Sequence, residues 1–254
     1  MADKSKSFEE LREDLYRSIK GVNRYNPENI PNLEKAIRMM IDDHNCYDKD
    51  ILLTTLKLYQ LNVEKFNEAV VAQILLKAMM VFPRNDFALA KYLIDGKFLM
   101  EGSKSYSPDL RRIMDIGAIL EACNFGLFWK LMRNEYQPSD SPSEKFSNPA
   151  DVQKTIKQVA GFEDAVRRFA CQVINVTFQS IEKPLLLRLL GGISEQQLAP
   201  FAKYFGWKPQ PDGTYFVQNH EDTIKSRNIE EKLKFDQCAV VVRSGIPGYF
   251  GEFP

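Results

Sequence analysis

Two histidines, His44 and His220, are the first residues to test for acid–base or nucleophilic catalysis, since histidine is the side chain used most often for it. Both fall in predicted polar turns, where a solvent-exposed side chain is the more frequent outcome. The four cysteines are far apart and form no C-x-x-C pair, which favours buried free thiols over a disulfide frame or a zinc site; they are Cys46, Cys123, Cys171 and Cys238. We therefore expect no catalytic residue, no cofactor-binding residue and no metal ligand.

Other short patterns with chemical potential have simpler structural interpretations. The sequence contains no G-x-S-x-G, P-loop, G-x-G-x-x-G or H-E-x-x-H pattern. The adjacent acidic pairs Asp42-Asp43, Glu163-Asp164 and Glu221-Asp222 do not face each other on a helix, which favours ordinary partners of helix ends over an acid–base pair. Gly191-Gly192 resembles a phosphate-binding turn, but more simply ends one helix before Ser194 and Gln197 form a capping box for the next.

Two groups of residues, one basic and one aromatic, have side chains that can bind nucleic acid. Arg111-Arg112, Arg167-Arg168 and a third basic set are interleaved with acidic residues, a pattern that favours a solvated helix face over an RNA contact. That third set is Lys225, Arg227, Lys232 and Lys234. An aromatic cluster (Tyr204, Phe205, Trp207, Tyr215 and Phe216) has the chemistry to stack on bases, although such residues more often fill a small core.

Bulk composition limits the possible partners. Lys and Arg total 34 and Asp and Glu total 34, so no global field attracts nucleic acid or an anionic membrane. A chain of 254 residues fits one large or two modest domains. The polar start MADKSKSFEE and the absence of a long apolar run predict a cytosolic or nuclear protein, and we expect it in the cytoplasm.

Residues 161–217 have the order of elements of a winged helix. We expect helices at 162–176, 184–190 and 195–205, a β-leaning run at Thr177, Phe178 and Ile181, and a turn at 211–213. That turn separates Trp207 from the run Tyr215, Phe216 and Val217. This extended helix-turn-helix order usually places its last helix in a DNA groove. Here the last helix, SEQQLAPFAKYF, has one base, Lys203, which is poorly suited to neutralising phosphates and favours a protein partner.

The residues before this module predict helix after helix. Ser7 and Glu10 form a capping box for a first helix that ends at Gly21, and Ser107 with Pro108 begins a later one. Apolar spacing predicts further helices near 31–40, 50–61, 64–81, 87–94 and 125–132. Short turns between such helices indicate antiparallel neighbours, as in a HEAT-like solenoid. The expected fold class is mainly α, a HEAT-like helical-repeat domain followed by a winged-helix domain with a small antiparallel sheet.

The resulting domain organisation has four parts. Residues 1–136 form the helical-repeat domain, 137–160 a linker and connecting helix, 161–218 the winged-helix domain, and 219–254 a C-terminal helix and mobile tail. The linker assignment depends on the polar, Pro- and Ser-rich segment QPSDSPSEKFSN, after which Asn148 and Pro149 cap a helix. The C-terminal helix is expected at 228–242.

The expected binding surface follows from the small sheet of a winged helix. Such a sheet has an open edge, and an open edge is a template for pairing with another chain. We therefore expect partner contacts at the wing and along one side of the last helix. The candidate residues are Tyr215, Phe216, Val217, Phe235, Cys238 and Val242.

Five pieces of the sequence, in this order and spacing, resemble the subunit K family of eukaryotic translation initiation factor 3. They are RYNPENI (24–30), LKLYQLN (56–62), AQILLKA (72–78), GFEDAVRRF (161–169) and KYFGW (203–207), and the similarity runs from about residue 8 to residue 236. The resemblance implies a non-catalytic scaffold subunit in an assembly that binds the small ribosomal subunit and promotes recruitment of initiator tRNA and mRNA. It also implies contact with other subunits of the factor, the L subunit above all, through winged-helix sheet edges and C-terminal helices. Residues 137–157 and the tail after Arg243 depart from the compact family pattern.

Three alternatives remain open at this point. The first is the same scaffold role in the proteasome lid or the COP9 signalosome. The second is a winged-helix nucleic-acid-binding protein, which needs a basic face. The third is an enzyme, which needs a pocket holding His44 or His220 beside a carboxylate.

Overall fold

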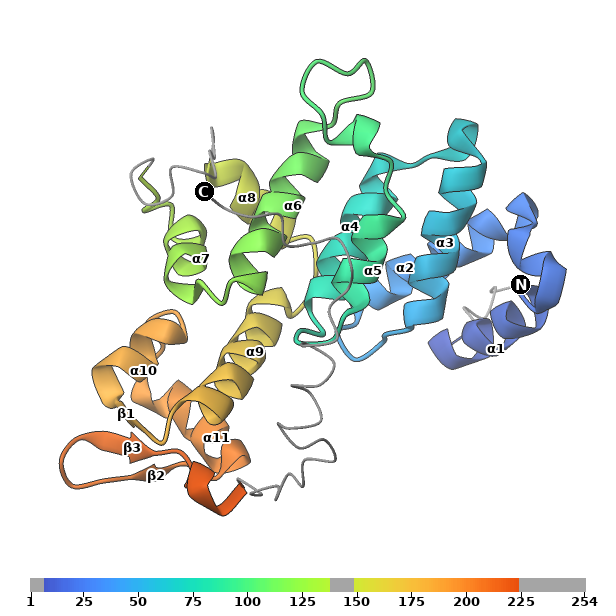
Figure 1. The fold of residues 1–254 in the computed structure, drawn as a ribbon. Coiled ribbons are helices and arrows are strands. Elements are labelled where there is room, and N and C mark those ends of the chain that lie inside the picture. Colours follow the sequence, from blue (N-terminus) through green and yellow to red (C-terminus); the bar gives the residue numbers. More distant parts are fainter. Residues whose placement is uncertain (1–6, 138–148, 224–254) are drawn as a thin grey trace, which may run out of the picture. The chain divides into compact units, whose positions relative to one another are not determined.

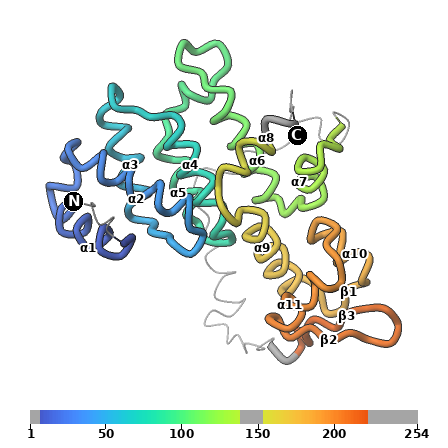
Figure 2. The backbone as a smooth tube through the Cα atoms, turned by 180° about the vertical axis from the view of Figure 1, so that it is seen from behind, coloured from blue at the N-terminus to red at the C-terminus, as the bar shows by residue number. Residues whose placement is uncertain are grey.

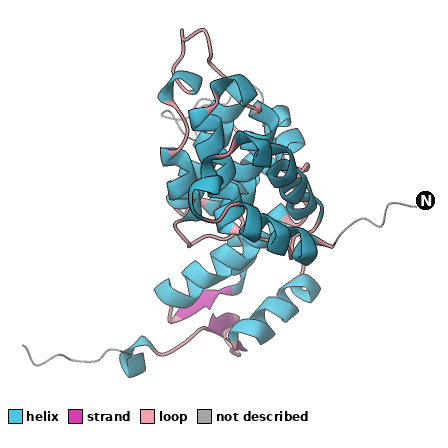
Figure 3. Cartoon of the chain, turned by 90° about the vertical axis from the view of Figure 1, so that its right-hand side faces the viewer, coloured by secondary structure: helices cyan, strands magenta, loops and turns pink. Residues whose placement is uncertain are grey.

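The computed structural model describes residues 7–137 and 149–223, and the chain divides into two compact units, residues 1–218 and 219–254. The first unit is mainly helical (Figure 1), and among its described residues the strands lie in the C-terminal, winged-helix part (Figure 3). In the second unit the described residues form a short 3-10 helix, η5 (His220–Thr223). The predicted fold class, a helical repeat followed by a winged helix with a small antiparallel sheet, is confirmed.

The helical-repeat part is a succession of helices that pack on their neighbours in the chain (Figure 2). The α-helices are α1 (Phe8–Ser18), α2 (Ile30–Asp42), α3 (Lys49–Leu61), α4 (Glu68–Met79), α5 (Asp86–Tyr92), α6 (Pro108–Glu121) and α7 (Phe125–Met132). Short 3-10 helices lie between them at η1 (Gly21–Tyr25), η2 (Pro27–Asn29), η3 (Val63–Lys65) and η4 (Gly96–Phe98). Contacts join each helix mainly to the next one or two, which is the local pattern of a helical repeat.

Side-chain caps set several of these helix starts. Ser7 Oγ accepts a hydrogen bond from Glu10 N while Glu10 Oε2 accepts one from Ser7 N, so the predicted capping box is confirmed. Ser107 caps α6 through Leu110 N, with Pro108 at the first position, again as predicted. The first helix ends at Ser18 rather than Gly21. Gly21 instead begins η1 with a φ of +61°, a left-handed conformation that glycine tolerates.

The predicted start of the fourth helix at residue 64 is wrong. Helix α4 begins at Glu68, because the Asn67 side chain accepts a hydrogen bond from Val70 N and so caps it there. Residues just before it form η3. Phe66, expected on the apolar stripe of this helix, stacks on Phe98 with ring centroids 4.1 Å apart.

Two tyrosine hydroxyls connect parts of the helical repeat that are distant in the chain, each through a carboxylate. Tyr16 on α1 donates to Asp48, the residue that caps α3, at 2.7 Å. Tyr47 donates to Asp86, the first residue of α5, at 2.6 Å. Hydrogen bonds to a charged acceptor are stronger than neutral ones, so these links stabilise the placement of α1 relative to α3 and of the start of α3 relative to α5.

The winged helix has the predicted order of elements. It consists of α9 (Phe162–Thr177), β1 (Ser180–Glu182), α10 (Lys183–Leu189), α11 (Glu195–Phe205), β2 (Lys208–Pro209) and β3 (Thr214–Phe216). Ser194 and Gln197 form the expected capping box on α11, with bonds of 3.3 and 3.0 Å. Thr177, expected in the β-leaning run, instead ends α9, and its hydroxyl donates to Val173 O one turn earlier. The strand begins three residues later, at Ser180.

Some predicted segments fall outside the described residues. These are most of the polar linker, the helix expected at 228–242 and the C-terminal tail, and they include Phe235, Cys238 and Val242. The connecting helix α8 (Pro149–Ile156) begins at Pro149, as expected. The four-part domain division stays a prediction.

Candidate partner-binding surfaces

Helix α11 carries little positive charge in the place where a DNA-reading winged helix needs it. Lys203 is the one base on this helix and is exposed. Lys183, at the start of α10, pairs with Glu195 at the start of α11, with Nζ and Oε1 2.5 Å apart. One free lysine cannot replace the several phosphate contacts on which duplex affinity depends.

The wing residues Tyr215 and Phe216 lie on the central strand of the sheet. Strand order is β1-β3-β2, so β3 lies in the centre and pairs on both sides. Tyr215 faces Ile181 on one side and Pro209 on the other. Strand β3 is therefore not itself a sheet edge, and the expectation that Tyr215, Phe216 and Val217 contact a partner stays a prediction. Val217 is also buried and donates its N–H to Gln179 O.

Strand β1 supplies the open edge instead. In antiparallel pairs the residues alternate between those bonded to the partner strand and those directed away from it. Val217 N donates to Gln179 O and Lys183 N donates to Gly213 O, so odd-numbered residues of this segment bond to the β3 side. The main-chain groups of Ser180 and Glu182 are thus directed away from β3. Within the described part of the chain, no strand pairs with that side of β1.

Strand β2 is a poorer edge because of Pro209. Gln210 N donates to Thr214 O, and Lys208 faces Phe216, so the alternation places Pro209 on the outer side. Proline has no N–H to donate, and proline on an edge strand blunts pairing with another chain. Of the two sheet edges, β1 is the one equipped to accept a further strand.

Two exposed apolar residues of the winged helix are Val176, on α9, and Tyr204, on α11. Their side chains are 72% and 83% exposed. Trp207 lies between their helices, since its Nε1 donates to Asn175 Oδ1 and its ring stacks on Phe205, which in turn contacts Tyr204. Trp207 is buried, as the prediction of an aromatic core expects, whereas Tyr204 is not part of that core.

Sequence reasoning missed Val176 as a surface residue. The helical spacing of apolar residues could have identified it. The buried positions of α9 include Ala170 and Ile174, and Val176 lies on a different side of the helix from them. Its exposure adds apolar surface at the end of the winged helix. Scattered exposed apolar residues are normal, so Val176 and Tyr204 by themselves do not identify a partner.

Three of the basic residues for which a solvated face was expected, Arg111, Arg112 and Arg167, are ion-paired with nearby acids. Arg111 pairs with Asp115 at 3.1 Å and Arg112 with Asp109 at 2.8 Å. The third basic set, from Lys225 onward, lies outside the described residues. The local pairs leave no accumulated positive charge on α6.

The two histidines lie apart from any obvious reaction centre. His44 occupies the turn after α2, where its half-exposed ring is 4.0 Å from the carboxylate of the adjacent Asp43. His220 begins η5 and is half-buried, more covered than the exposed turn that was expected. Over residues 7–137 and 149–223, no group of three His, Cys, Asp or Glu side chains is arranged to hold a metal ion.

The cysteines differ in exposure. Cys171 is buried, and burial raises the pKa of its thiol to about 12. Cys46 is half-buried, and burial together with Asp43 raises its pKa. Cys123 is exposed, so the expectation of buried thiols is wrong there; it follows α6 with a φ of +54°. All three of these described cysteines are free thiols, and Cys238 lies outside the described residues.

Among the described helices, none combines the length and the apolar character needed to cross a lipid bilayer.

Comparisons with known proteins give one consistent result. The CSN8/PSMD8/EIF3K family matches residues 65–228. The chain is 60% identical to eukaryotic translation initiation factor 3 subunit K of Brugia malayi over 90% of its own length and 94% of that protein. It is 54% identical to the Caenorhabditis elegans protein of the same name, over 94% and 97%. The Homo sapiens protein of that name is 35% identical, over 93% and 98%.

Proposed function

The chain belongs to the CSN8/PSMD8/EIF3K family, and on that premise we propose that it is a non-catalytic scaffold of eukaryotic translation initiation factor 3. Its function as a subunit of this translation initiation factor rests on relatives that carry that name and match it over nearly their whole length. The family description also covers proteins of two other complexes. Identity of 60% to a protein named as subunit K favours the initiation factor over those two.

The scaffold acts by holding other subunits of the factor, and the L subunit is its nearest neighbour. It acts in the cytoplasm, and it reaches the small ribosomal subunit through the assembly. One combination of features supports a protein-binding role. The module has the fold of a DNA-binding winged helix, but α11 has a single base, and the outer side of β1 has no paired strand among the described residues. Pairing at this edge gives a partner strand main-chain hydrogen bonds, and it needs no catalysed reaction.

The test of the edge contact is a proline at position 182. Glu182 has a φ of −66°, the value to which proline is restricted, so Glu182→Pro should fold normally. It removes one of the two outward N–H groups of β1, keeps that of Ser180, and leaves the bonds to β3 intact. We expect this variant to lose at least about tenfold in affinity for the L subunit, because a hot-spot contact of about 1.4 kcal/mol corresponds to that factor.

Glu182→Ala is the matched control, since it removes the same side chain and keeps the N–H. Equal binding of the L subunit by the proline and alanine variants would contradict the edge contact. Circular dichroism and urea unfolding of both variants establish that any difference does not come from unfolding.

A second contact is proposed for the C-terminal helix, on the sequence pattern of Phe235, Cys238 and Val242. Replacement of Phe235 and Val242 by Asp places charge on the apolar side of that helix and should detach the protein from its partner while the monomer stays folded. The remaining wing candidates, Tyr215 and Phe216, are half-buried side chains on β3 and contribute through their faces rather than their main chain. Retained co-purification of the double variant would count against the helix contact.

Binding to nucleic acid is the competing outcome. A filter-binding titration of the purified chain with duplex DNA and with RNA, repeated across salt concentrations, should show no steep salt dependence. A steep negative slope of log affinity against log salt would instead reveal several phosphate contacts and favour the nucleic-acid alternative.

A further inference from the structure

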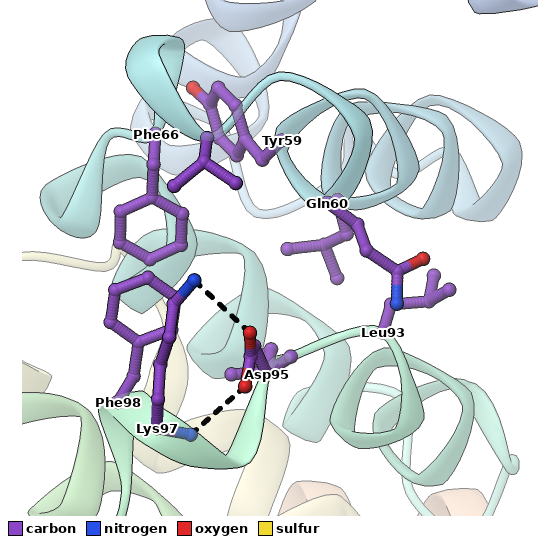
Figure 4. A pocket seen from close by; sticks show the side chains of 10 residues that line it. Tyr59, Gln60, Phe66, Leu93, Asp95, Lys97 and Phe98 are labelled. Carbon is purple, nitrogen blue, oxygen red and sulfur yellow. Dashed lines mark hydrogen bonds and ion pairs between the residues drawn. The ribbon is translucent and has the colours of Figure 1, made fainter. Parts of the chain in front are cut away.

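A small apolar pocket lies between α3 and the α5–η4 segment of the helical repeat, and Tyr59, Phe66 and Phe98 form one of its walls (Figure 4). Its volume of about 30 Å³ is too small for a nucleotide or another cofactor. At its rim Lys97 and Asp95 form an ion pair, with Nζ and Oδ2 3.1 Å apart (Figure 4). The pocket therefore does not specify a partner, whereas the edge strand β1 carries groups that do.

Strand β1 lies at the edge of the sheet, beside β3 (Figure 1). Ser180 and Glu182 are exposed, and their N–H groups are directed away from β3, as is the C=O of Ser180. The C=O of an N-cap residue, here Glu182, accepts the first bond of the helix that it begins. Both strand pairs of this sheet are antiparallel, so we expect an added strand to be antiparallel too. Such a strand exchanges two hydrogen bonds with Ser180 and accepts a third from Glu182 N.

The register of the sheet places Ser180, Phe216 and Lys208 in one row. Ile181 is buried, so the side chains of Ser180 and Glu182, which alternate with it, lie on the opposite, exposed face. Phe216 is half-buried on that face. Neighbouring strands are about 4.8 Å apart, so a residue opposite Ser180 on an added strand lies about 10 Å from Phe216, with the small serine between them. A large apolar side chain there can reach over Ser180 and cover the Phe216 ring.

The next row of the sheet carries negative charge. Glu182 faces Thr214, whose hydroxyl and N–H donate to Asp212 Oδ1 at 2.7 and 3.0 Å. These hydrogen bonds lower the pKa of Asp212, so both neighbours of Thr214 are ionised carboxylates at neutral pH. Neither carboxylate forms an ion pair within the described ranges, whereas Lys183, next to Glu182, pairs with Glu195. A basic residue opposite Glu182 on an added strand is complementary to this charge.

We propose that β1 binds an antiparallel segment of another subunit of the factor in which a lysine or arginine precedes a large apolar residue by two positions. An antiparallel partner runs opposite to β1 with the same alternation of side chains, so its basic residue faces Glu182 and its apolar residue faces Ser180. The inference rests on the proposed scaffold function and specifies the strand that this edge recognises.

Photocrosslinking in the assembled factor identifies that strand. Benzoylphenylalanine at position 180 should crosslink to an extended segment of another subunit that has this pattern. The control is the same group at position 204, because Tyr204 is 83% exposed on α11 and lies outside the sheet. A crosslink from position 180 to RNA, to this chain, to a helix or to a segment without the pattern would overturn the proposal. So would the absence of a crosslink, or the same crosslink from position 204.

Charge reversal at Glu182 tests the basic residue. Glu182→Lys keeps the main-chain N–H, and it should bind the crosslinked subunit about threefold to fivefold more weakly than Glu182→Ala in low salt, because like charges opposite each other on neighbouring strands repel. Glutamate at the basic position of the crosslinked segment should restore the affinity of Glu182→Lys. Gln196→Lys, at an exposed position of α11 outside the sheet, is the control and should bind as the wild type does.

Comparison with Glu182→Pro separates this proposal from the scaffold function. Weakened binding by Glu182→Pro, together with equal binding by Glu182→Lys and Glu182→Ala, would overturn the proposed pattern and leave the edge contact standing. Failure of the glutamate to restore affinity would overturn the pattern in the same way. Binding by all three variants equal to that of the wild type would overturn both the pattern and the edge contact.

Discussion

The indole of Trp129 lies directly against the backbone of Gly191. Trp129, on α7, is buried, and its Nε1 donates to Leu189 O at 2.8 Å. A Cβ atom at position 191 would lie 2.7 Å from Cδ2 of the indole, closer than real carbon atoms approach. The absence of a side chain at Gly191 therefore allows the helical repeat to pack on the winged helix within the first unit.

Gly191→Ala should destabilise this junction. Gly191 has a φ of +91°, which an L-residue rarely adopts, and the added methyl overlaps the indole. Overpacking of a buried site costs about 1–3 kcal/mol beyond the backbone strain. Urea unfolding should show a lower midpoint with an unchanged m-value.

Gly192→Ala isolates the steric part of that effect. This residue also has a positive φ, +74°, but a Cβ there would meet no atom within 4 Å. Its cost should be the backbone strain alone, about 1–2 kcal/mol. Equal destabilisation by the two variants would show that contact with Trp129 does not determine the requirement for glycine at 191.

Gly117→Ala should also destabilise, against the ordinary preference of a helix for alanine. Gly117 lies within α6, and a Cβ there would be 2.2 Å from Cζ of the buried Phe87. The overlap costs about 1–3 kcal/mol and outweighs the gain in helix propensity of about 1 kcal/mol. Gly126→Ala in α7 is the control, because its nearest neighbour would be 4.0 Å away and the propensity gain remains. Thermal unfolding should move in opposite directions, and a shift of the same sign in both would contradict the packing argument.

Local signals in the sequence were sufficient for most helix boundaries. The two capping boxes, at Ser7 and Ser194, and the Ser107-Pro108 start depend on contacts within four residues, so residue types alone identify them. The error at α4 has the same local origin. Phe66, Val70 and Ile74 keep helical spacing whether the helix begins at 64 or at 68, so the apolar stripe cannot locate the start, and the Asn67 cap decides it.

The order of strands was beyond the reach of local signals. Tyr215, Phe216 and Val217 have the alternation of any short strand, and nothing in it tells whether the strand lies at an edge or in the centre. The position of the strand depends on its pairing with Ser180, which is distant in the chain, and with Lys208, which precedes it by one turn. The open edge on β1 therefore emerged only from the register.

Tyr47→Phe should make stability less dependent on alkaline pH. Burial, and secondarily the hydrogen bond to Asp86, raise the pKa of Tyr47 well above its ordinary value of 10.0. Below pH 10 the folded and unfolded states both keep the proton, and the stabilisation is fully present. As pH rises above 10, the unfolded state loses the proton first, so the wild type loses stability.

The measurement is urea unfolding at pH 7 and at pH 10.5. At pH 7 the variant should be less stable by about 1–3 kcal/mol, because the buried Asp86 loses the Tyr47 donor and keeps its ion pair with Arg84 at 3.4 Å. At the higher pH that difference should shrink. Tyr92→Phe, at an exposed position, should match the wild type at both values. A difference for Tyr47→Phe that stays constant or grows with pH would contradict the assignment.

Arg167→Lys should weaken the same junction as Gly191→Ala, although it conserves the charge. Arg167 on α9 pairs with Glu163 at 3.1 Å and Asp164 at 2.7 Å, and its Nε donates to Leu190 O. Its guanidinium also lies over the Trp129 ring, 5.0 Å from the centroid.

The single ammonium of lysine cannot make all the hydrogen bonds of the planar guanidinium and also stack on the indole. We therefore expect a loss of about 1–3 kcal/mol in the free energy of unfolding. Arg168→Lys is the matched control, because Arg168 is the next residue on the same helix and is exposed. In the double variant with Gly191→Ala, the loss of unfolding free energy should be smaller than the sum of the losses in the two single variants. The reason is that both substitutions disturb the contacts of Trp129. Strict additivity would show that Arg167 stabilises α9 on its own and does not contribute to the packing of the helical repeat on the winged helix.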